Sequence, residues 1–336
     1  MLAPAWGRAW KLQPMSRNYV SPRSADNNCG RYCGPRCNRD PRPWLRDSNF
    51  SAGFVINDLD FTKQTRDGLY DPDIARSLFE SLGEPCNLAK DEAFFAENEK
   101  SNNLYLLLKG EVRLFRRKRV LDIIRDGEIF GEMAAITGKP RTAWAIAIKP
   151  CKALQLSPDK FRQALRETPQ FAVMLMGIMI NRIRVTMALL SRSGKLSPGL
   201  ASENERVFSN EVIEQMSASL VNRPPMKVAA KKVIMREGDS GKFMYVVLSG
   251  RIAVFVNNAV VGHAGPGGMI GEIALVDGSG RAVTALAESD STLLPVSRED
   301  FQKMVESNPR FAVTMLRSVA IRLARMTFTS AALTNS

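Results

Sequence analysis

The sequence predicts a mainly β fold with α-helices, built as two tandem double-stranded β-helix (jelly-roll) domains that are each flanked by helices. Residues from about 97 to 186 recur from 237 to 326 at a constant offset of 140. A gapless repeat of this length indicates two copies of one domain. In each copy, short β-rich runs separated by glycines come first, which is typical of an antiparallel roll. Apolar residues at helical spacing follow in the second half of each copy.

Residues 1–55 are predicted to form a disordered basic tail. The chain has a net charge of +13, and its first 50 residues hold nine Arg or Lys against three Asp. They lack apolar periodicity, so burial would not offset the entropy lost on ordering. Cys29, Cys33 and Cys37 are regularly spaced there, but structural zinc needs four ligands and the one histidine is the distant His263. We therefore expect no metal site.

The first domain is predicted at residues 70–190. A short helix is expected near 72–82, followed by strands such as LYLLLKGEVRLF, which Gly110 interrupts. The later segment has apolar residues at helical spacing on both sides of Pro169, which predicts two helices.

The second domain is predicted at residues 209–330, after a linker at 191–208 that is rich in Ser, Gly and Pro. It repeats the order of the first domain. A short helix is expected near 210–220, the strand run MYVVLSGRIAVFV is interrupted by Gly250, and two helices are expected around Pro309.

One segment in each copy carries the chemistry: FGEMAAITGKPRTAWAIA at 130–147 and IGEIALVDGSGRAVTALA at 270–287. Each has Gly-Glu, a short apolar stretch and then a lone arginine. A planar guanidinium can donate hydrogen bonds to both exocyclic oxygens of a cyclic phosphate. A glutamate can accept a hydrogen bond from a ribose hydroxyl. The pattern predicts a site for a ribose cyclic phosphate; the alternative is an ordinary ion pair between each Glu and its Arg.

The residues predicted to bind this ligand occupy equivalent positions in the two copies. The glycines allow the backbone to approach the ligand closely. A helical turn after Gly-Glu would point backbone N–H groups toward the phosphate. The residue after the arginine adds a hydroxyl in the first copy and only its backbone in the second. The set is Gly131, Glu132, Met133, Arg141 and Thr142, and Gly271, Glu272, Ile273, Arg281 and Ala282.

This motif resembles the phosphate-binding cassette of cyclic-nucleotide-binding domains, the family found in catabolite activator proteins and in the regulatory parts of cyclic-nucleotide-dependent kinases. The resemblance covers roughly residues 75–190 and 215–328. It implies that cAMP is the ligand, with cGMP left open. It also implies that a helix threonine contacts the base: Thr186 in the first domain, and Thr327 near the matching place in the second. A solvent-facing position is the alternative for both threonines.

Three residues depart from the family pattern, so we expect the pocket shape to differ between the copies. They are Ala135, Gly280 and Val283.

The resemblance implies a cyclic nucleotide sensor or regulatory protein rather than an enzyme, and no catalytic residue is predicted. We expect the helices at 171–187 and 311–326 to pack as an internal pseudo-dimer, with a homodimer between chains as the rival. Fewer than a dozen residues follow Arg325, too few for a helix-turn-helix, so we expect output through an unknown protein effector.

Two other functions stay open: a transcriptional regulator of the activator-protein type that binds DNA without a recognisable helix-turn-helix, and a scaffold whose cassettes bind no ligand. Specific DNA binding is not expected, because basic residues in a tail give salt-sensitive, non-specific contacts. No apolar run approaches the length of a membrane span and no signal peptide is recognisable, so we expect a cytoplasmic protein without membrane contact. Met15 offers an alternative start.

Overall fold

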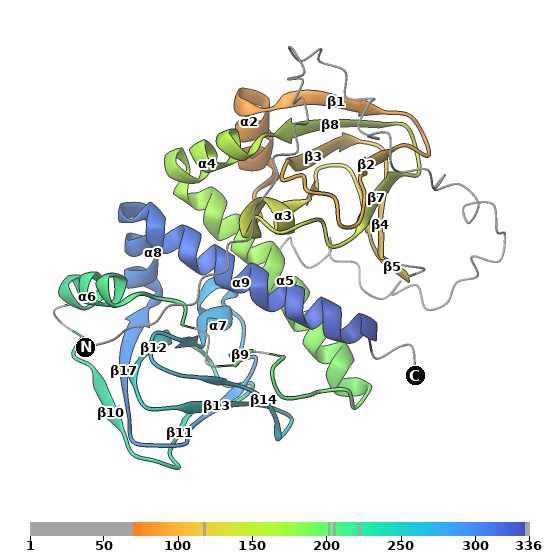
Figure 1. Ribbon diagram of the computed structural model, residues 1–336. Helices are drawn as coiled ribbons and strands as arrows, with labels where there is room; N and C mark the ends of the chain where they lie inside the picture. Colours follow the sequence, from red (N-terminus) through yellow and green to blue (C-terminus); the bar gives the residue numbers. More distant parts are fainter. Residues whose placement is uncertain (1–69, 117–118, 201, 204–205, 221–222, 333–336) are drawn as a thin grey trace, which may run out of the picture. The chain divides into compact units, whose positions relative to one another are not determined.

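The chain folds into two similar β-rolls, each followed by a long helix (Figure 1). The computed structural model describes residues 70–116, 119–200, 202–203, 206–220 and 223–332. All of these belong to one compact unit, Pro41–Ser336. The predicted basic tail, including Cys29, Cys33 and Cys37, lies outside the described residues.

The first roll is formed by two four-stranded sheets. Its strands are β1 (Glu84–Leu88), β2 (Ala93–Phe95), β3 (Leu104–Lys109), β4 (Val112–Arg116), β5 (Arg119–Ile124), β6 (Ile129–Phe130), β7 (Trp144–Ala147) and β8 (Cys151–Leu156). One sheet has the order β1-β8-β3-β6 and the other β2-β7-β4-β5, and all pairs are antiparallel. Apart from the hairpin of β4 and β5, neighbours in each sheet are not consecutive in sequence, which is the crossing pattern of a jelly roll.

The second roll repeats this topology. Its strands are β10 (Met226–Val228), β11 (Val233–Met235), β12 (Phe243–Ser249), β13 (Ile252–Val256), β14 (Ala259–Ala264), β15 (Met269–Ile270), β16 (Thr284–Ala287) and β17 (Ser291–Ser297). The sheets have the orders β10-β17-β12-β15 and β11-β16-β13-β14-β9. The additional strand β9 (Ser202–Glu203) comes from the segment predicted as a linker and pairs in parallel with β14.

A glycine is required at the turn between β3 and β4. Gly110 has φ +117°, and a Cβ there would lie 2.7 Å from the Sγ of Cys151. Gly250 stands at the same turn of the second roll, with φ +88°. Only glycine adopts such backbone angles without strain, which explains why a glycine interrupts each strand run.

Helices flank both rolls. They are α2 (Pro72–Leu82), α3 (Glu132–Thr137), α4 (Pro158–Glu167), α5 (Pro169–Arg192), α6 (Asn210–Ser219), α7 (Glu272–Asp277), α8 (Arg298–Ser307) and α9 (Pro309–Ala332). Several start signals are those the sequence displays: Ser157 caps α4, and Ser297 forms a capping box with Asp300 at α8. Proline opens α5 and α9, where its missing N–H would be unpaired in any case.

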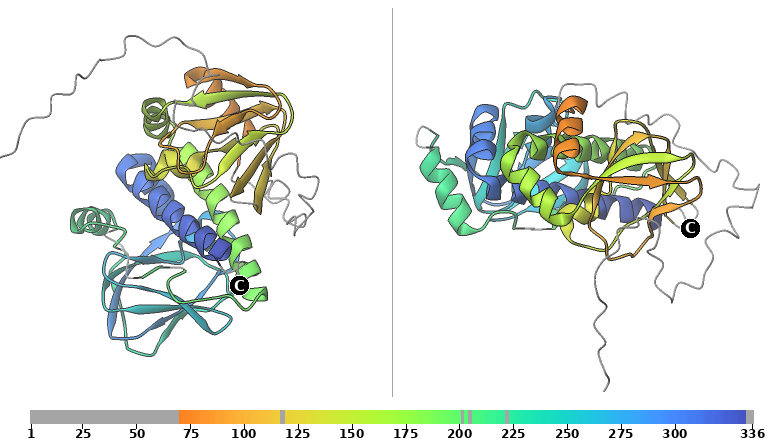
Figure 2. Two further views of the ribbon diagram at one scale, coloured as in Figure 1. Left: turned by 45° about the vertical axis from the view of Figure 1, so that its right-hand side comes forward. Right: turned by 90° about the horizontal axis from the view of Figure 1, so that it is seen from above.

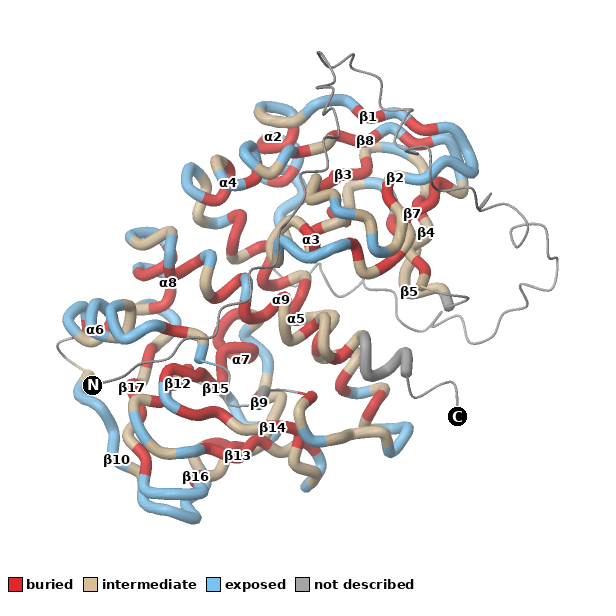
Figure 3. Tube along the Cα trace, viewed as in Figure 1, coloured by how far each residue is buried: buried red, intermediate tan, exposed pale blue. Residues whose placement is uncertain are grey.

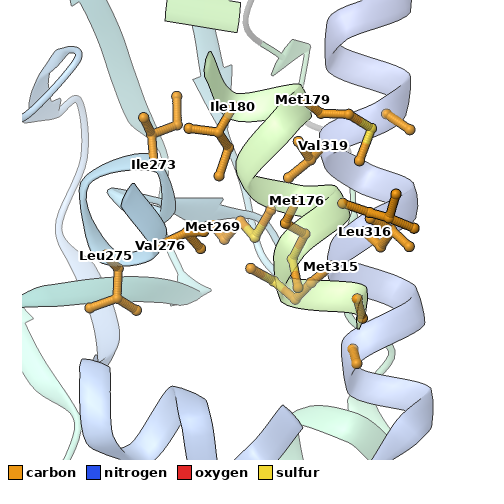
Figure 4. Packing of buried hydrophobic residues seen from close by; sticks show 14 of the residues in the cluster. Met176, Met179, Ile180, Met269, Ile273, Leu275, Val276, Met315, Leu316 and Val319 are labelled. Carbon is orange, nitrogen blue, oxygen red and sulfur yellow. The ribbon is translucent and has the colours of Figure 1, made fainter. Parts of the chain in front are cut away.

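The long helices α5 and α9 pack against each other within the chain, and the views in Figure 2 agree that they run side by side. Both carry continuous buried faces (Figure 3). Met176 and Met179 of α5 lie toward Leu316 and Val319 of α9, and all four are at most 1% exposed (Figure 4). Across the core, Ile180 of α5 points toward α7, which belongs to the second roll (Figure 4).

Helix α5 is also long and apolar enough to cross a membrane by length and composition. Half of its apolar window is buried in the fold, and it carries Asn181, Arg182 and Arg184 at its centre. Core helices of soluble domains have the same character. The packing against α9 and α7 accounts for the buried half of this window.

The structure confirms the predicted fold class: two tandem jelly-roll domains with flanking helices. Equivalent elements lie at the predicted offset, since α5 begins at Pro169 and α9 at Pro309, and α3 and α7 begin at Glu132 and Glu272.

Candidate functional site

The Gly-Glu step occupies the same position in both rolls, between a two-residue strand and a one-turn helix. Gly131 follows β6 and Gly271 follows β15, with φ of +81° and +82°. A Cβ on Gly131 would lie 2.9 Å from Nη1 of Arg141, and a Cβ on Gly271 would lie 2.5 Å from Nη1 of Arg281. Glycine is therefore required both for the backbone angle and for the close approach of the arginine.

Each nitrogen atom of the Arg141 guanidinium donates a hydrogen bond in the first cassette. Its Nε donates to Oγ of Ser101 at 2.9 Å, its Nη1 to the carbonyl oxygen of Gly131 at 2.9 Å, and its Nη2 to the carbonyl oxygen of Asn103 at 2.8 Å. The guanidinium carbon lies 4.0 Å from the ring centroid of Phe95. The side chain is 2% exposed, and this burial lowers its pKa.

Arg281 is also buried in the second cassette, with 6% of its surface exposed, but it has fewer partners. Among the described residues it donates one hydrogen bond, from Nη1 to the carbonyl oxygen of Gly271 at 3.0 Å. No carboxylate of the described residues forms an ion pair with it. Burial lowers the pKa of this guanidinium too. The carboxylates of Glu272 and Asp239 act on it only through longer-range attraction. A buried guanidinium without an ion-pair partner favours the binding of an anion.

The cassette glutamates do not pair with the cassette arginines, so the alternative of an ordinary Glu-Arg ion pair within each motif is wrong. Glu132 accepts a hydrogen bond from Arg182 of α5, and Glu272 accepts one from Arg322 of α9. Both glutamates are at most 3% exposed. Each cassette is thereby tied to the long helix of its own domain.

Arg182 and Arg322 were not among the predicted site residues. The signal for them was present, because they occupy matching positions of the repeat. Their partners lie 50 residues earlier in the chain, which only the folded structure brings into contact.

A cavity lies inside the second roll beside its cassette. The wall includes Gly271, Glu272, Ile273, Arg281 and Ala282, which are the five residues predicted there from the motif. The remaining wall is mainly apolar. The volume of the cavity is about 40 Å³, which is enough for a few water molecules. A nucleotide is much larger, so its entry requires the wall to move.

The first domain completes this second site. Met187 of α5, together with Leu196 and Leu200 of the following segment, closes the cavity. An open cleft of about 520 Å³ shares Met187, Arg281 and Ala282 with the cavity. The cassette arginine therefore borders both the closed cavity and an open cleft.

An ion pair also joins the first domain to the second cassette. Nε of Arg184 in α5 lies 2.5 Å from Oδ2 of Asp277, the last residue of α7, and its Nη2 donates to the carbonyl oxygen of Gly280 at 2.8 Å. Gly280 immediately precedes Arg281. The cassette loop of the second domain is thus held by a helix of the first.

The two predicted base-contacting threonines bond within their own helices. Thr186 donates its hydroxyl to the carbonyl oxygen of Arg182, and Thr327 donates to that of Leu323. Arg322 and Met326 of α9 line the second cavity, and Thr327 does not. In the first cassette, Met133 packs against the core and Thr142 is half-buried.

A second group of charged residues surrounds a small cavity behind the first cassette. Asp122, Glu128 and Arg182 line it together with Tyr70. Burial and the neighbouring Asp122 carboxylate raise the pKa of Glu128 from 4.5 to about 7. Burial also raises the pKa of Asp122, against the opposing effect of Arg182.

The raised pKa of Glu128 predicts that stability falls as pH rises. The folded state favours the protonated carboxyl, so its contribution is complete below pH 4.5 and lost as pH rises through about 7. The expected loss is at most roughly 3 kcal/mol. Urea unfolding at pH 5 and pH 7.5 measures it, and Glu128→Gln should be less pH-dependent than the wild type. Identical pH profiles for the two proteins would contradict this prediction.

Within the described residues, no group of three or more His, Cys, Asp or Glu is placed to hold a metal ion. The cysteines in this part of the chain, Cys86 and Cys151, are buried and are not joined by a disulfide.

Comparison with known proteins identifies the family. The sequence model described as cyclic nucleotide-binding domain matches residues 85–168 and 225–308, which together make up half of the chain. The CRP-like cAMP-activated global transcriptional regulator of Mycobacterium tuberculosis is 26% identical over 121 residues, which are 34% of this chain and 54% of that protein. The chain therefore spans about half the length of the curated relatives it matches.

Two solved structures are also similar. The regulatory domain of Toxoplasma gondii PKA with cAMP is 17% identical, covering 72% of this chain and 94% of that one, with a TM-score of 0.27. The catabolite activator protein of Thermus thermophilus is 24% identical, covering 39% of this chain and 72% of that one, with a TM-score of 0.30. By the two matched segments and the duplicated roll, this chain belongs to the cyclic nucleotide-binding domain family.

Proposed function

We propose that this chain is a cyclic nucleotide sensor that binds cAMP through the Gly-Glu and Arg residues of its cassette and regulates a partner protein. The observation that carries the proposal is Arg281, a buried guanidinium without a carboxylate partner among the described residues, at the wall of an apolar cavity. A cyclic nucleotide has one negative charge on its phosphate and an apolar base face, which suit the two parts of this wall.

The cassette residues would divide the ligand between them. The guanidinium of Arg281 and the backbone N–H of Ala282 would bind the exocyclic phosphate oxygens, while Glu272 would accept the hydrogen bond of the ribose 2′-hydroxyl. Since Glu272 is already paired with Arg322, the ribose would compete with or join that pair. Ligand binding would therefore act on α9.

cAMP rather than cGMP is supported by the similar mycobacterial regulator, which is cAMP-activated. The matched domain is a binding domain, which supports a regulatory role without catalysis. We propose a cytoplasmic location for this regulatory protein. The effector is proposed to be a protein that contacts the flanking helices.

Calorimetric titration of the full chain tests this function. The protein is first denatured and refolded, and its absorbance at 260 nm is checked so that no bound nucleotide remains. We expect saturable binding of cAMP, weaker binding of cGMP, and no binding of AMP, which lacks the cyclic phosphate. The Arg141→Gln/Arg281→Gln double variant should bind neither. Absence of saturable heat with folded wild-type protein would contradict the proposal.

A further inference from the structure

The two cassettes share a motif but differ in what surrounds the arginine. We propose that the second cassette binds the cyclic nucleotide and that the first is a filled copy, whose arginine is held by its own roll and accepts no ligand. This proposal rests on the proposed function and assigns ligand binding to the second domain alone.

Arg141 already uses three of its five N–H groups in hydrogen bonds to its own roll. Its Nε, Nη1 and Nη2 atoms each have an oxygen acceptor within 2.9 Å, one on Ser101 and two on the backbone. One face of its guanidinium is covered by Phe95. An incoming phosphate would have to break these bonds inside a roll where the side chain is 2% exposed.

Aromatic rings fill the first roll around this arginine. The ring of Tyr105 is stacked on that of Phe130 at 5.1 Å, and Phe95 lies 6.0 Å from Tyr105. Phe94 packs edge-on against Phe130 at 5.0 Å. These four rings come from β2, β3 and β6, and Phe95 and Phe130 stand at the positions whose counterparts line the cavity of the second roll.

The second roll has smaller or more flexible side chains at the matching positions. At the offset of 140, Ile234, Met235 and Ile270 replace Phe94, Phe95 and Phe130. Met235 and Ile270 line the cavity beside Arg281. A thioether chain can move aside where a phenyl ring cannot, so this wall can open for a ligand.

Gly241 offers Arg281 no side-chain hydrogen-bond acceptor. It stands at the position matched to Ser101, the residue that binds Nε of Arg141. A Cβ on Gly241 would lie 2.9 Å from both Cζ and Nε of Arg281. A side chain here would therefore occupy or bind the edge of the guanidinium that the cavity otherwise reaches. The backbone of Gly241 is not in the left-handed region, but a Cβ there would lie 2.8 Å from the Cβ of Ala274, so a serine also has to displace α7 slightly.

The test exchanges these two residues in the full chain and counts sites by calorimetry with cAMP. We expect one site per chain in the wild type. Gly241→Ser should weaken binding by roughly 10- to 100-fold, the size of a lost charge-assisted hydrogen bond. Ser101→Gly, the matched control in the first roll, should keep the wild-type affinity of the second site. Near-ultraviolet circular dichroism checks that each variant is folded, and Arg281→Gln gives an independent loss of the same site.

The outcomes separate the two proposals. Two sites in the wild type, or one site that survives with unchanged affinity in both Gly241→Ser and Arg281→Gln, would overturn the division between cassettes but keep the proposed function. No site in folded wild-type protein would overturn the proposed function, and the division with it. One site that is lost in both second-roll variants and kept in Ser101→Gly supports both.

Discussion

Replacing Arg322 with alanine is expected to lower the free energy of unfolding by about 3–5 kcal/mol, because it leaves a buried carboxylate without its countercharge. Glu272 is 1% exposed, and Arg322 is its ion-pair partner. Removing one member of a buried pair is more destabilising than removing both. Urea unfolding followed by fluorescence and circular dichroism measures the loss.

Two variants control this result. Arg251→Ala removes one partner of an ion pair on the same domain whose side chains are 50% and 38% exposed. Exposed pairs contribute at most about 1 kcal/mol, so this variant should stay close to the wild type. Adding Glu272→Gln to Arg322→Ala should recover part of the lost stability. Equal, small losses for Arg322→Ala and Arg251→Ala would contradict the argument from burial.

Replacing Leu316 with alanine is expected to destabilise the chain by about 2–5 kcal/mol, through a cavity between the long helices. Leu316 is 0% exposed and lies on the face of α9 that packs against α5. Since this interface joins the two rolls, the variant should also separate their unfolding transitions in a calorimetric scan. Both effects have one cause, the loss of contact across the helix pair.

Val313→Ala is the matched control for Leu316→Ala. Val313 lies on the same helix, is also apolar and is 40% exposed. It should change the free energy of unfolding by less than about 1 kcal/mol, because little apolar area is lost. A single, unsplit transition and a small loss in Leu316→Ala would show that the helix pair does not hold the rolls together.

The fold could be predicted in large part because duplication doubles every local signal. The role of a single glycine such as Gly131 is ambiguous in the sequence. Its recurrence as Gly271 indicates that both domains require a glycine at this position, and both have positive φ. The proline starts of α5 and α9 and the period change within each copy are local features of the same kind. Local signals predict which segments are helices and which are strands. The repeat predicts which of these segments belong to the same domain.

The surroundings of the site could not be predicted in the same way, because they depend on contacts between distant residues. Ser101 meets Arg141 across 40 residues of sequence, and nothing in the motif distinguishes a bonded arginine from a free one. Similarly, the offset matches Thr186 with Met326 rather than with Thr327, and Met326 lines the cavity whereas Thr327 does not. The motif in the sequence identifies a segment as a cassette. Whether its arginine is available to a ligand depends on the residues that surround it in the fold.

Fusing two copies into one chain removes a restriction that identical subunits obey. In a two-fold dimer of identical chains, every interface contact occurs twice. Here Arg184 binds Asp277, while the residues at the exchanged positions, Ala324 and Thr137, carry no charge. This ion pair therefore exists in one direction only, from the helix of the first domain to the cassette of the second. A substitution at either residue alters a single link, so each half of the pair is free to specialise independently.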